Sequence, residues 1–306
     1  IGLLGQGVSA PGDVGVITYT QWLNEGGTLE ADLTVTRLDD DRFFVVATDT
    51  AHRHVETHMR RAFADAHAFV TDVTSAYAQI NVQGPRSRAL LQSLTGTDLS
   101  NEAFPYRAAR EIELGFARVL CVRITYLGEL GYELYVPTEQ ATHVYDLLVE
   151  AGAAHGLRHA GLKALASLRM EKGYRDYGHD IDNTDTVLEA GLGFAVTVDK
   201  PGGFIGRDAV LAQKAKGSLT RRLLQVRVKH PEPLMFHAEV VLRDGRAVGY
   251  IRAASYGFTD TDARDGGQWG VSLRWQPSGS AANYGVYAMN YHDKLPALKD
   301  LAVTTS

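Results

Sequence analysis

Residues 19–35 (YTQWLNEGGTLEADLTV) limit the folds open to this chain more than any other stretch. Two runs of apolar and β-branched residues flank a pair of glycines, which predicts two strands joined by a turn. Every second residue from Leu29 to Val35 is apolar, so one face of the second strand is expected to pack in a core. Asp32 lies on the other face. Strands are depleted in aspartate and a half-buried carboxylate is costly, so Asp32 is either solvated or functional.

The remaining segments mix strand and helix patterns without a regular βαβ repeat, which predicts an α+β fold rather than a doubly wound sheet. Expected strands are 34–38, 43–48, 80–82, 119–126, 132–136, 223–228, 238–242 and 247–252. Expected helices are 49–64, 85–94, one beginning at 138, 160–172 and 207–216. The dipeptide Asp244-Gly245 predicts a tight hairpin between the last two strands.

A domain boundary is expected between residues 180 and 204, where 183–185 (NTD) and 201–203 (PGG) interrupt the pattern. From residue 260 to residue 306 the chain is rich in Gly, Ser, Asp and Asn, with weak periodicity. We therefore expect this tail to be poorly packed.

Charge and cysteine content exclude several classes of protein. The net charge is −5 and the basic residues are scattered, so no nucleic-acid partner is expected. No apolar run approaches membrane-spanning length, and the first residues lack the features of a signal peptide. The single cysteine, Cys121, cannot form an internal disulfide, which fits a cytoplasmic or organelle-matrix compartment.

Two apparent motifs are dismissed. Residues 5–10 (GQGVSA) match a loose dinucleotide pattern, but Pro11 follows and only four residues precede, so no strand–turn–helix context exists. No flavin-binding domain is therefore expected in this chain. His54 and His58 have the i, i+4 spacing of a metal pair, yet no clear set of carboxylate or thiolate partners accompanies them. We expect a solvated helix face and no metal site.

Residues 24–35 (NEGGTLEADLTV), preceded by Tyr19, resemble the signature of the tetrahydrofolate-dependent aminomethyltransferase family. That family includes the glycine-cleavage T protein and the carboxyl-terminal half of sarcosine and dimethylglycine dehydrogenases. Further blocks that agree in order are 82–85 (VQGP), 125–136, 167–174 (SLRMEKGY), 177–180 (YGHD) and 191–209. The resemblance runs from about residue 15 to about 259. Around residues 168–180 and 250–259 the sequence is more similar to the sarcosine and dimethylglycine dehydrogenases than to the free-standing T protein.

The resemblance implies an aminomethyltransferase-type folate-binding α+β domain over residues 1–182, followed by a partial β-barrel domain over 183–259 and a divergent tail at 260–306. The family has several dozen more residues before the Tyr19 block, and its pattern disappears after residue 259. The fold is therefore expected to be incomplete at both ends, as in an internal piece of a longer protein or a gene product altered at both ends.

The resemblance also implies roles for individual residues. Asp32 matches the catalytic aspartate, and Glu133 matches the carboxylate that accepts the two neighbouring donors of the pterin edge. Tyr19 and Tyr126 match folate contacts, and Val46 matches a lining position. Each tyrosine is otherwise an ordinary core residue, and Glu133 is otherwise an exposed strand charge.

Arg169 has three open interpretations. Its guanidinium could form an ion pair with Glu171, cap a helix, or contact a folate carboxylate. We favour the structural ion pair and keep Arg169 among the candidate folate-binding residues.

The resemblance implies a one-carbon transferase that uses tetrahydrofolate and forms 5,10-methylenetetrahydrofolate during sarcosine or dimethylglycine oxidation. An ionised Asp32 near the attacking folate nitrogen would stabilise positive charge and accept a proton, with no metal or covalent nucleophile. The implied partner is an FAD-dependent amine dehydrogenase domain or subunit, in the cytoplasm or the mitochondrial matrix. The alternatives are a folate-binding or regulatory module without chemistry, and an inactive fragment.

Overall fold

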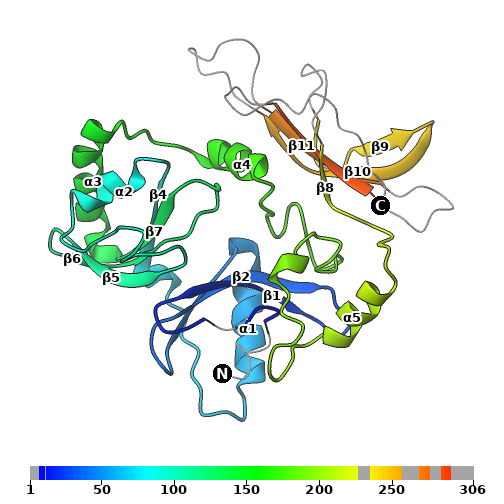
Figure 1. Cartoon of the computed structure of the whole chain (residues 1–306), viewed down its shortest axis with the longest axis horizontal. Coiled ribbons are helices and arrows are strands. Elements are labelled where there is room, and N and C mark those ends of the chain that lie inside the picture. The colour runs from blue at the N-terminus through cyan, green and yellow to red at the C-terminus, as the bar shows by residue number, and fades with distance from the viewer. Residues whose placement is uncertain (1–6, 11, 227–234, 257–268, 276–283, 291–306) are drawn as a thin grey trace.

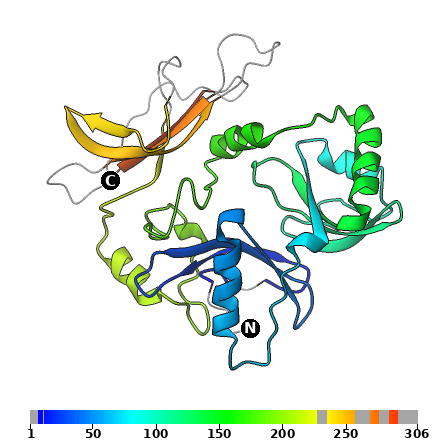
Figure 2. The ribbon, with the colours of Figure 1, turned by 180° about the vertical axis from the view of Figure 1, so that it is seen from behind.

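The computed structural model describes residues 7–10, 12–226, 235–256, 269–275 and 284–290, with side-chain burial up to residue 253. Three antiparallel sheets carry the described structure, and Figures 1 and 2 show them arranged around a common centre. The first two sheets come from the amino-terminal part of the chain. The third sheet is built by the carboxyl-terminal part.

The first sheet has the order β1-β2-β3, formed by β1 (Ile17–Leu23), β2 (Leu29–Arg37) and β3 (Phe43–Ala47). The predicted alternation in β2 holds, because its apolar residues pack in a core with α1 (His52–Ala62). Figure 2 shows α1 lying across this sheet. Members of this core include Trp22, Ala31, Leu33, Ala51 and Val55.

The second sheet has the order β4-β7-β6-β5. Its strands are β4 (Tyr77–Gln83), β5 (Ala109–Leu114), β6 (Ala117–Val122) and β7 (Gly131–Pro137). One face packs with α2 (Ser87–Gln92) and α3 (Ala141–His155) around Leu91, Phe104 and Leu134. We predicted no strand at β5, where Arg110, Glu111 and Glu113 obscure the apolar alternation.

The free faces of these two sheets meet in a second core. Ile17 from β1 packs there with Val122 and Tyr135 from the second sheet. The ring of Phe44 on β3 contacts the ring of Tyr135 edge to face, with centroids 4.9 Å apart. Side chains of β1 to β3 that point away from α1 are therefore turned toward the second sheet.

The segment after α4 (Leu162–Glu171) does not behave as a simple linker. The expected domain boundary at residues 180–204 contains Asp185 and Thr186. The backbone N–H of Leu29 donates to the carbonyl of Asp185 (2.9 Å), and Thr28 forms a β-bridge with Thr186. Val187 and Leu192 then pack with Leu23 and Leu29 in one core before α5 (Arg207–Ala215) begins. This segment therefore belongs structurally to the first sheet.

The third sheet has the order β12-β11-β10-β9, with β8 paired to β11. Its strands are β8 (Leu224–Val226), β9 (Val240–Arg243), β10 (Arg246–Tyr256), β11 (Trp269–Trp275) and β12 (Tyr284–Asn290). Asp244 and Gly245 both have positive φ (50° and 74°), as the two-residue hairpin turn between β9 and β10 requires.

The tail at residues 260–306, which was expected to be poorly packed, carries two strands among its described residues. β11 and β12 lie within residues 260–306, and β11 pairs with β8, β10 and β12. Residues 269–275 (WGVSLRW) alternate apolar and other residues, a pattern that the surrounding Gly- and Ser-rich composition concealed. The third sheet therefore extends beyond the expected limit at residue 259.

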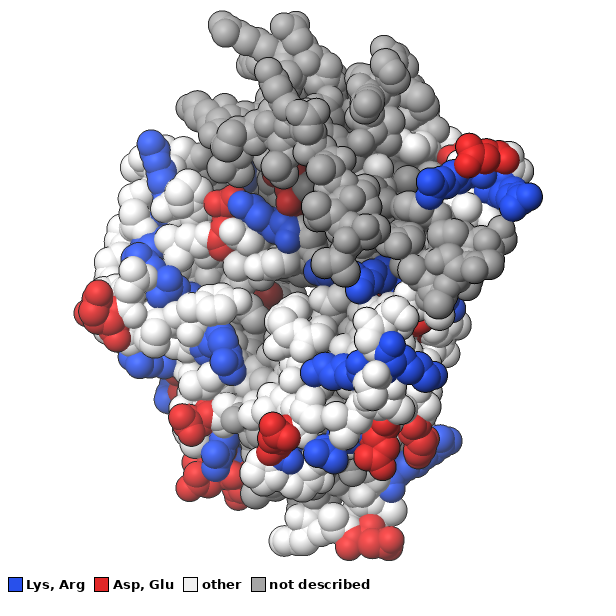
Figure 3. Space-filling view, turned by 45° about the vertical axis from the view of Figure 1, so that its right-hand side comes forward, with Lys and Arg blue, Asp and Glu red and all other residues white. Residues whose placement is uncertain are grey.

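The distribution of surface charge and the apolar character of the helices can be compared with the sequence. Figure 3 shows basic and acidic side chains interspersed on one face of the molecule. Among the described residues, no helix has the length and apolar character needed to cross a membrane.

Candidate functional site

A row of side chains crosses the face of the first sheet that is turned away from α1. Strand register pairs Gln21 with Asp32, and pairs Thr34 with both Tyr19 and Val46. Directly paired residues of antiparallel strands project on the same face, and so do residues two apart on one strand. Five side chains from three strands therefore share one surface that faces the centre of the molecule.

Asp32 is the ionisable centre of this face. Its side chain is buried, with 8% of the residue exposed, and its Oδ1 accepts a 2.7 Å hydrogen bond from Gln21 Nε2. Burial raises the pKa of Asp32 to about 6, although hydrogen bonds from Gln21 and Tyr19 act in the opposite direction. Asp32 is thus mainly ionised at pH 7 and close to its titration range.

Tyr19 and Tyr126 join Asp32 from two elements. Burial and the neighbouring Asp32 charge raise the pKa of Tyr19 well above its usual value. Burial also raises the pKa of Tyr126, whose hydroxyl donates to the backbone carbonyl of Arg175 (2.8 Å). Both phenols therefore remain protonated and can donate hydrogen bonds. The structure brings these two predicted residues together with Asp32.

Arg175 and Asp176 also act on Asp32, and sequence reasoning missed both. The guanidinium of Arg175 lowers the pKa of Asp32, and the carboxylate of Asp176 raises it. Arg175 is held by backbone carbonyls, with Nε donating to Ala190 at 3.0 Å. The resemblance covered the neighbouring motifs at 167–174 and 177–180 but gave Arg175 no role. Arg175 is 143 positions from Asp32 in the sequence.

Glu133 lies on β7, on the face of the second sheet that is turned toward the first. Its Oε2 accepts a 2.6 Å hydrogen bond from the hydroxyl of Tyr135 on the same face. Burial raises the pKa of Glu133, while this hydrogen bond lowers it. Val46 packs against the core that contains Tyr135. Glu133 and Val46 therefore lie near the seam between the two sheets, and Asp32 lies farther along the same face of the first sheet as Val46.

Arg169 occupies a buried ion pair. Its guanidinium contacts both carboxylate oxygens of Asp180, with Nη2 3.4 Å from Oδ1, and Asp176 lies 3.8 Å away. The residue is 3% exposed and its pair is with Asp180 rather than Glu171. This geometry favours the structural role, because the guanidinium is already neutralised and enclosed.

Histidines of α1 contact acidic and aromatic side chains. His54 lies 3.0 Å from Glu30, and the ring of His58 contacts Trp22. Among the described residues, the group with metal-ligand spacing is instead His52, Glu56 and Asp72. Arg53 and Arg60 already pair with Glu56, at 3.3 and 3.0 Å. These ion pairs are sufficient to explain why the three side chains lie close together, without a bound metal ion.

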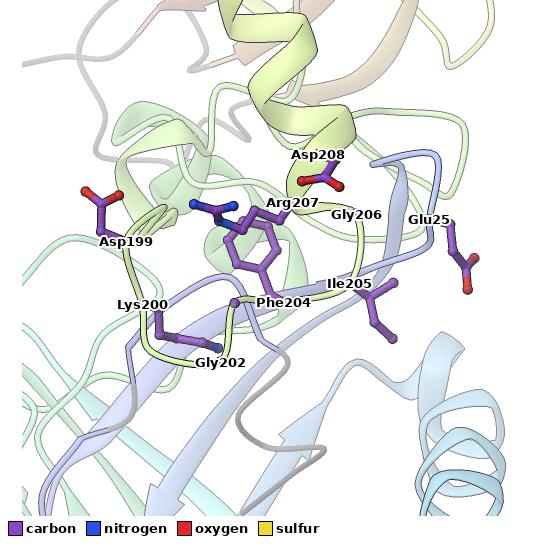
Figure 4. Close-up of a pocket in the computed structure, with 10 residues that line it drawn as sticks. Glu25, Asp199, Lys200, Gly202, Phe204, Ile205, Gly206, Arg207 and Asp208 are labelled. Carbon is purple, nitrogen blue, oxygen red and sulfur yellow. The ribbon is translucent and has the colours of Figure 1, made fainter.

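A cavity of about 820 Å³ opens elsewhere, between the β1–β2 turn and the loop before α5 (Figure 4). Its lining carries both signs of charge. Glu25 and Asp208 are acidic, and Lys200 and Arg207 are basic. None of the predicted site residues lines it. The cavity is therefore separate from the Asp32 face.

Two family models match the chain. One described as "GCVT N-terminal domain" covers residues 7–200, and one described as "Protein of unknown function (DUF1302)" covers residues 186–306. The first of these matches includes every residue of the Asp32 face. It also includes the first two sheets and the segment that packs beneath β1.

Curated relatives share substantial identity over much of the chain. "4-Methylaminobutanoate oxidase (formaldehyde-forming)" of Paenarthrobacter nicotinovorans is 40% identical over 256 residues, covering 82% of this chain and 31% of that protein. "Sarcosine dehydrogenase, mitochondrial" of Mus musculus is 35% identical over 306 residues, covering 92% of this chain and 33% of that protein. The chain thus spans about a third of the length of these relatives.

A solved structure shares the fold. It is described as glycine cleavage system aminomethyltransferase T from Bartonella henselae, with a TM-score of 0.70 and 22% identity. The match covers 91% of this chain and 76% of that one. The predicted aminomethyltransferase-type fold, with mixed helices and sheets, is therefore confirmed.

Proposed function

The chain belongs to the GCVT family, that of the tetrahydrofolate-dependent aminomethyltransferases, and on this premise we propose that it is a one-carbon transferase module. Its acceptor would be tetrahydrofolate and its product 5,10-methylenetetrahydrofolate. The observation that carries the proposal is Asp32, a buried and mainly ionised carboxylate with two protonated tyrosines beside it.

The polar groups of the Asp32 face, together with Glu133 on the facing second sheet, suit a reduced folate. A pterin edge offers an amino group and a ring N–H side by side, and a carboxylate such as Glu133 can accept both. Tyr19 and Tyr126 supply aromatic faces for a flat ring. Gln21 has a buried amide oxygen with no hydrogen-bond partner in the described part of the chain, and an N–H of the ligand would satisfy it.

We assign Asp32 two tasks, both performed by its carboxylate. When bound, tetrahydrofolate supplies two nitrogens that can carry a carbon at the oxidation level of formaldehyde. The ionised Asp32 stabilises positive charge that develops beside it and accepts the proton released when the carbon–nitrogen bond forms. Burial strengthens this interaction, because little water competes for the charge.

The source of the one-carbon unit would be a methylated amine oxidised by an FAD-dependent domain or subunit. The names of the two relatives, an oxidase and a dehydrogenase, support this part of the proposal, as does their greater length. Sarcosine or dimethylglycine is the class of amine proposed. The proposed setting is the cytoplasm or the mitochondrial matrix, and the word mitochondrial in the name of the mouse relative supports the second of these.

Asp32→Asn tests the proposal, because it preserves size and hydrogen bonding but removes the charge and the proton acceptor. We expect tetrahydrofolate affinity to change little, while enzyme-dependent product formation from formaldehyde falls by about 10²–10⁴-fold. The rate must be measured above the uncatalysed condensation. A variant that turns over at the parental rate would remove Asp32 from catalysis. A parent protein that binds tetrahydrofolate without turnover would favour the binding-module alternative.

A further inference from the structure

Gln21 has an unusual position on the Asp32 face. The residue is fully buried, with 0% exposed, and stands directly opposite Asp32 in the β1–β2 register. Its amide nitrogen donates to Asp32 Oδ1 at 2.7 Å. This bond fixes the orientation of the amide, because the reverse orientation would set its oxygen against the carboxylate.

The amide oxygen of Gln21 has no hydrogen-bond partner among the described residues. Leaving a buried acceptor unpaired costs free energy, so native proteins rarely retain one without a reason. Gln140 has a similar unpaired oxygen, but it lies at the start of α3. Among the residues that the structure describes, only the amide of Gln21 combines an unpaired oxygen with a hydrogen bond to Asp32.

We propose that Gln21 bridges Asp32 and the reacting end of the reduced folate, with its amide nitrogen holding the carboxylate and its amide oxygen accepting an N–H of the ligand. This inference rests on the proposed function, since it assumes that tetrahydrofolate binds at Asp32. The acceptor suits a reduced folate because N5 and N10 can each present an N–H near the carbon-transfer position. The side chain is a positioning residue toward Asp32 and a binding residue toward the ligand.

The charged and titratable groups around Asp32 define the background for a test. Tyr19 approaches on β1, and Arg175 and Asp176 approach from the segment after α4. Tyr126 also senses the Asp32 charge. A variant of Gln21 leaves these groups in place, so a change in Asp32 titration reports the lost amide bond.

The test uses Gln21→Met, which preserves length and removes both amide atoms, with Gln140→Met as the matched control. In the ligand-free protein, a carbon NMR titration should show the Asp32 pKa above its parental value of about 6 in Gln21→Met, because a bond to the ionised form is lost. Gln140→Met should leave it unchanged. Asp32→Asn identifies the resonance, and thermal unfolding checks that each variant folds.

Calorimetry with tetrahydrofolate tests the other half of the bridge. Gln21→Met should weaken affinity by about 3–30-fold, the scale for losing one buried hydrogen bond, and Gln140→Met should not. Gln21→Glu keeps an acceptor but loses the donor, so its affinity should fall less while the carboxylate pair titrates higher. It also serves if Gln21→Met fails to fold.

An unmoved Asp32 titration, or an unchanged affinity in Gln21→Met, overturns the bridge. A parent protein without tetrahydrofolate affinity overturns the proposed function as well. The two failures are therefore distinguishable.

Discussion

At the scale of single residues, the two carboxylates of the proposed site differ in their surroundings. Glu133 is half-buried and already accepts a hydrogen bond from Tyr135, whereas Asp32 is buried beside Gln21. Both carboxylates have raised pKa values, chiefly because burial disfavours the charged form. Recognition and chemistry can therefore be separated by mutating each carboxylate.

Glu133→Gln should weaken tetrahydrofolate binding because it replaces an acceptor with a donor that faces other donors. The expected loss is about 1–3 kcal/mol, or several-fold to about hundred-fold in affinity, measured by calorimetry. Glu111→Gln is the control, since Glu111 is an exposed carboxylate on β5 that pairs with Arg118. Equal affinity of Glu133→Gln and the parent, in a folded protein, would remove Glu133 from the site.

Asp32→Asn should also raise stability at neutral pH. Because the folded pKa of Asp32, about 6, lies above its usual 3.8, folding is favoured by this group at low pH. That contribution is lost as pH rises through 6, and its full size is about 3 kcal/mol at about 1.4 kcal/mol per pKa unit.

The variant should therefore gain up to this amount in urea unfolding at pH 8, and little at pH 4. A stability difference that is independent of pH would contradict the assigned titration of Asp32.

At the scale of elements, the start of α5 is fitted closely against the β1–β2 turn. Gly206 has φ +80°, and a Cβ there would lie 2.4 Å from the carbonyl oxygen of Asn24. The left-handed conformation alone costs a non-glycine residue about 1–2 kcal/mol, and a clash with backbone adds to it. The loop before α5 can therefore approach β1 only with glycine at this position.

Gly206→Ala should lower the free energy of unfolding by more than about 2 kcal/mol, measured from the shift in the urea midpoint. Gly217→Ala is the matched control, because Gly217 also has positive φ (+70°) but none of the described residues has an atom within 4 Å of the added Cβ. The control should lose only the conformational part. Equal losses in the two variants would show that the close approach contributes nothing.

At the scale of the whole molecule, an ion-pair network joins the third sheet to the segment after α4, which packs against the first sheet. Arg252 on β10 contacts Asp182 at 2.6 Å and Asp185 at 2.7 Å, and Arg221 contacts Asp185 at 2.9 Å. Burial alone would raise the pKa of Asp182, but hydrogen bonds from Arg252 and Thr184 lower it to about 2.

Arg252→Met should destabilise the protein by about 3–5 kcal/mol at pH 7, because it leaves buried carboxylates with less compensation. The third sheet should then be cut faster in limited proteolysis. Arg243→Met is the control, since Arg243 lies on the exposed hairpin with its Asp244 contact at 3.9 Å. Equal stability and equal proteolysis of both variants would exclude the network as the link between the parts.

The sequence by itself determined the local structure where one rule was sufficient. Alternation from Leu29 to Val35 fixed which face of β2 packs in a core, and the Asp244-Gly245 pair fixed a hairpin. The motif residues indicated the family, and they predicted that Asp32, Tyr19 and Tyr126 belong to one site. Composition misled at residues 260–306, because a Gly- and Ser-rich background concealed the alternation of β11.

Only the tertiary structure decided what surrounds Asp32. Periodicity says which side chains share a face of one strand, but it does not give the register that sets Gln21 opposite Asp32, and a slip of one residue would turn Gln21 away. Arg175 is distant in sequence, so its effect on Asp32 exists only after folding. The raised pKa of Asp32 is likewise a property of burial, which the sequence determines only through the packed whole.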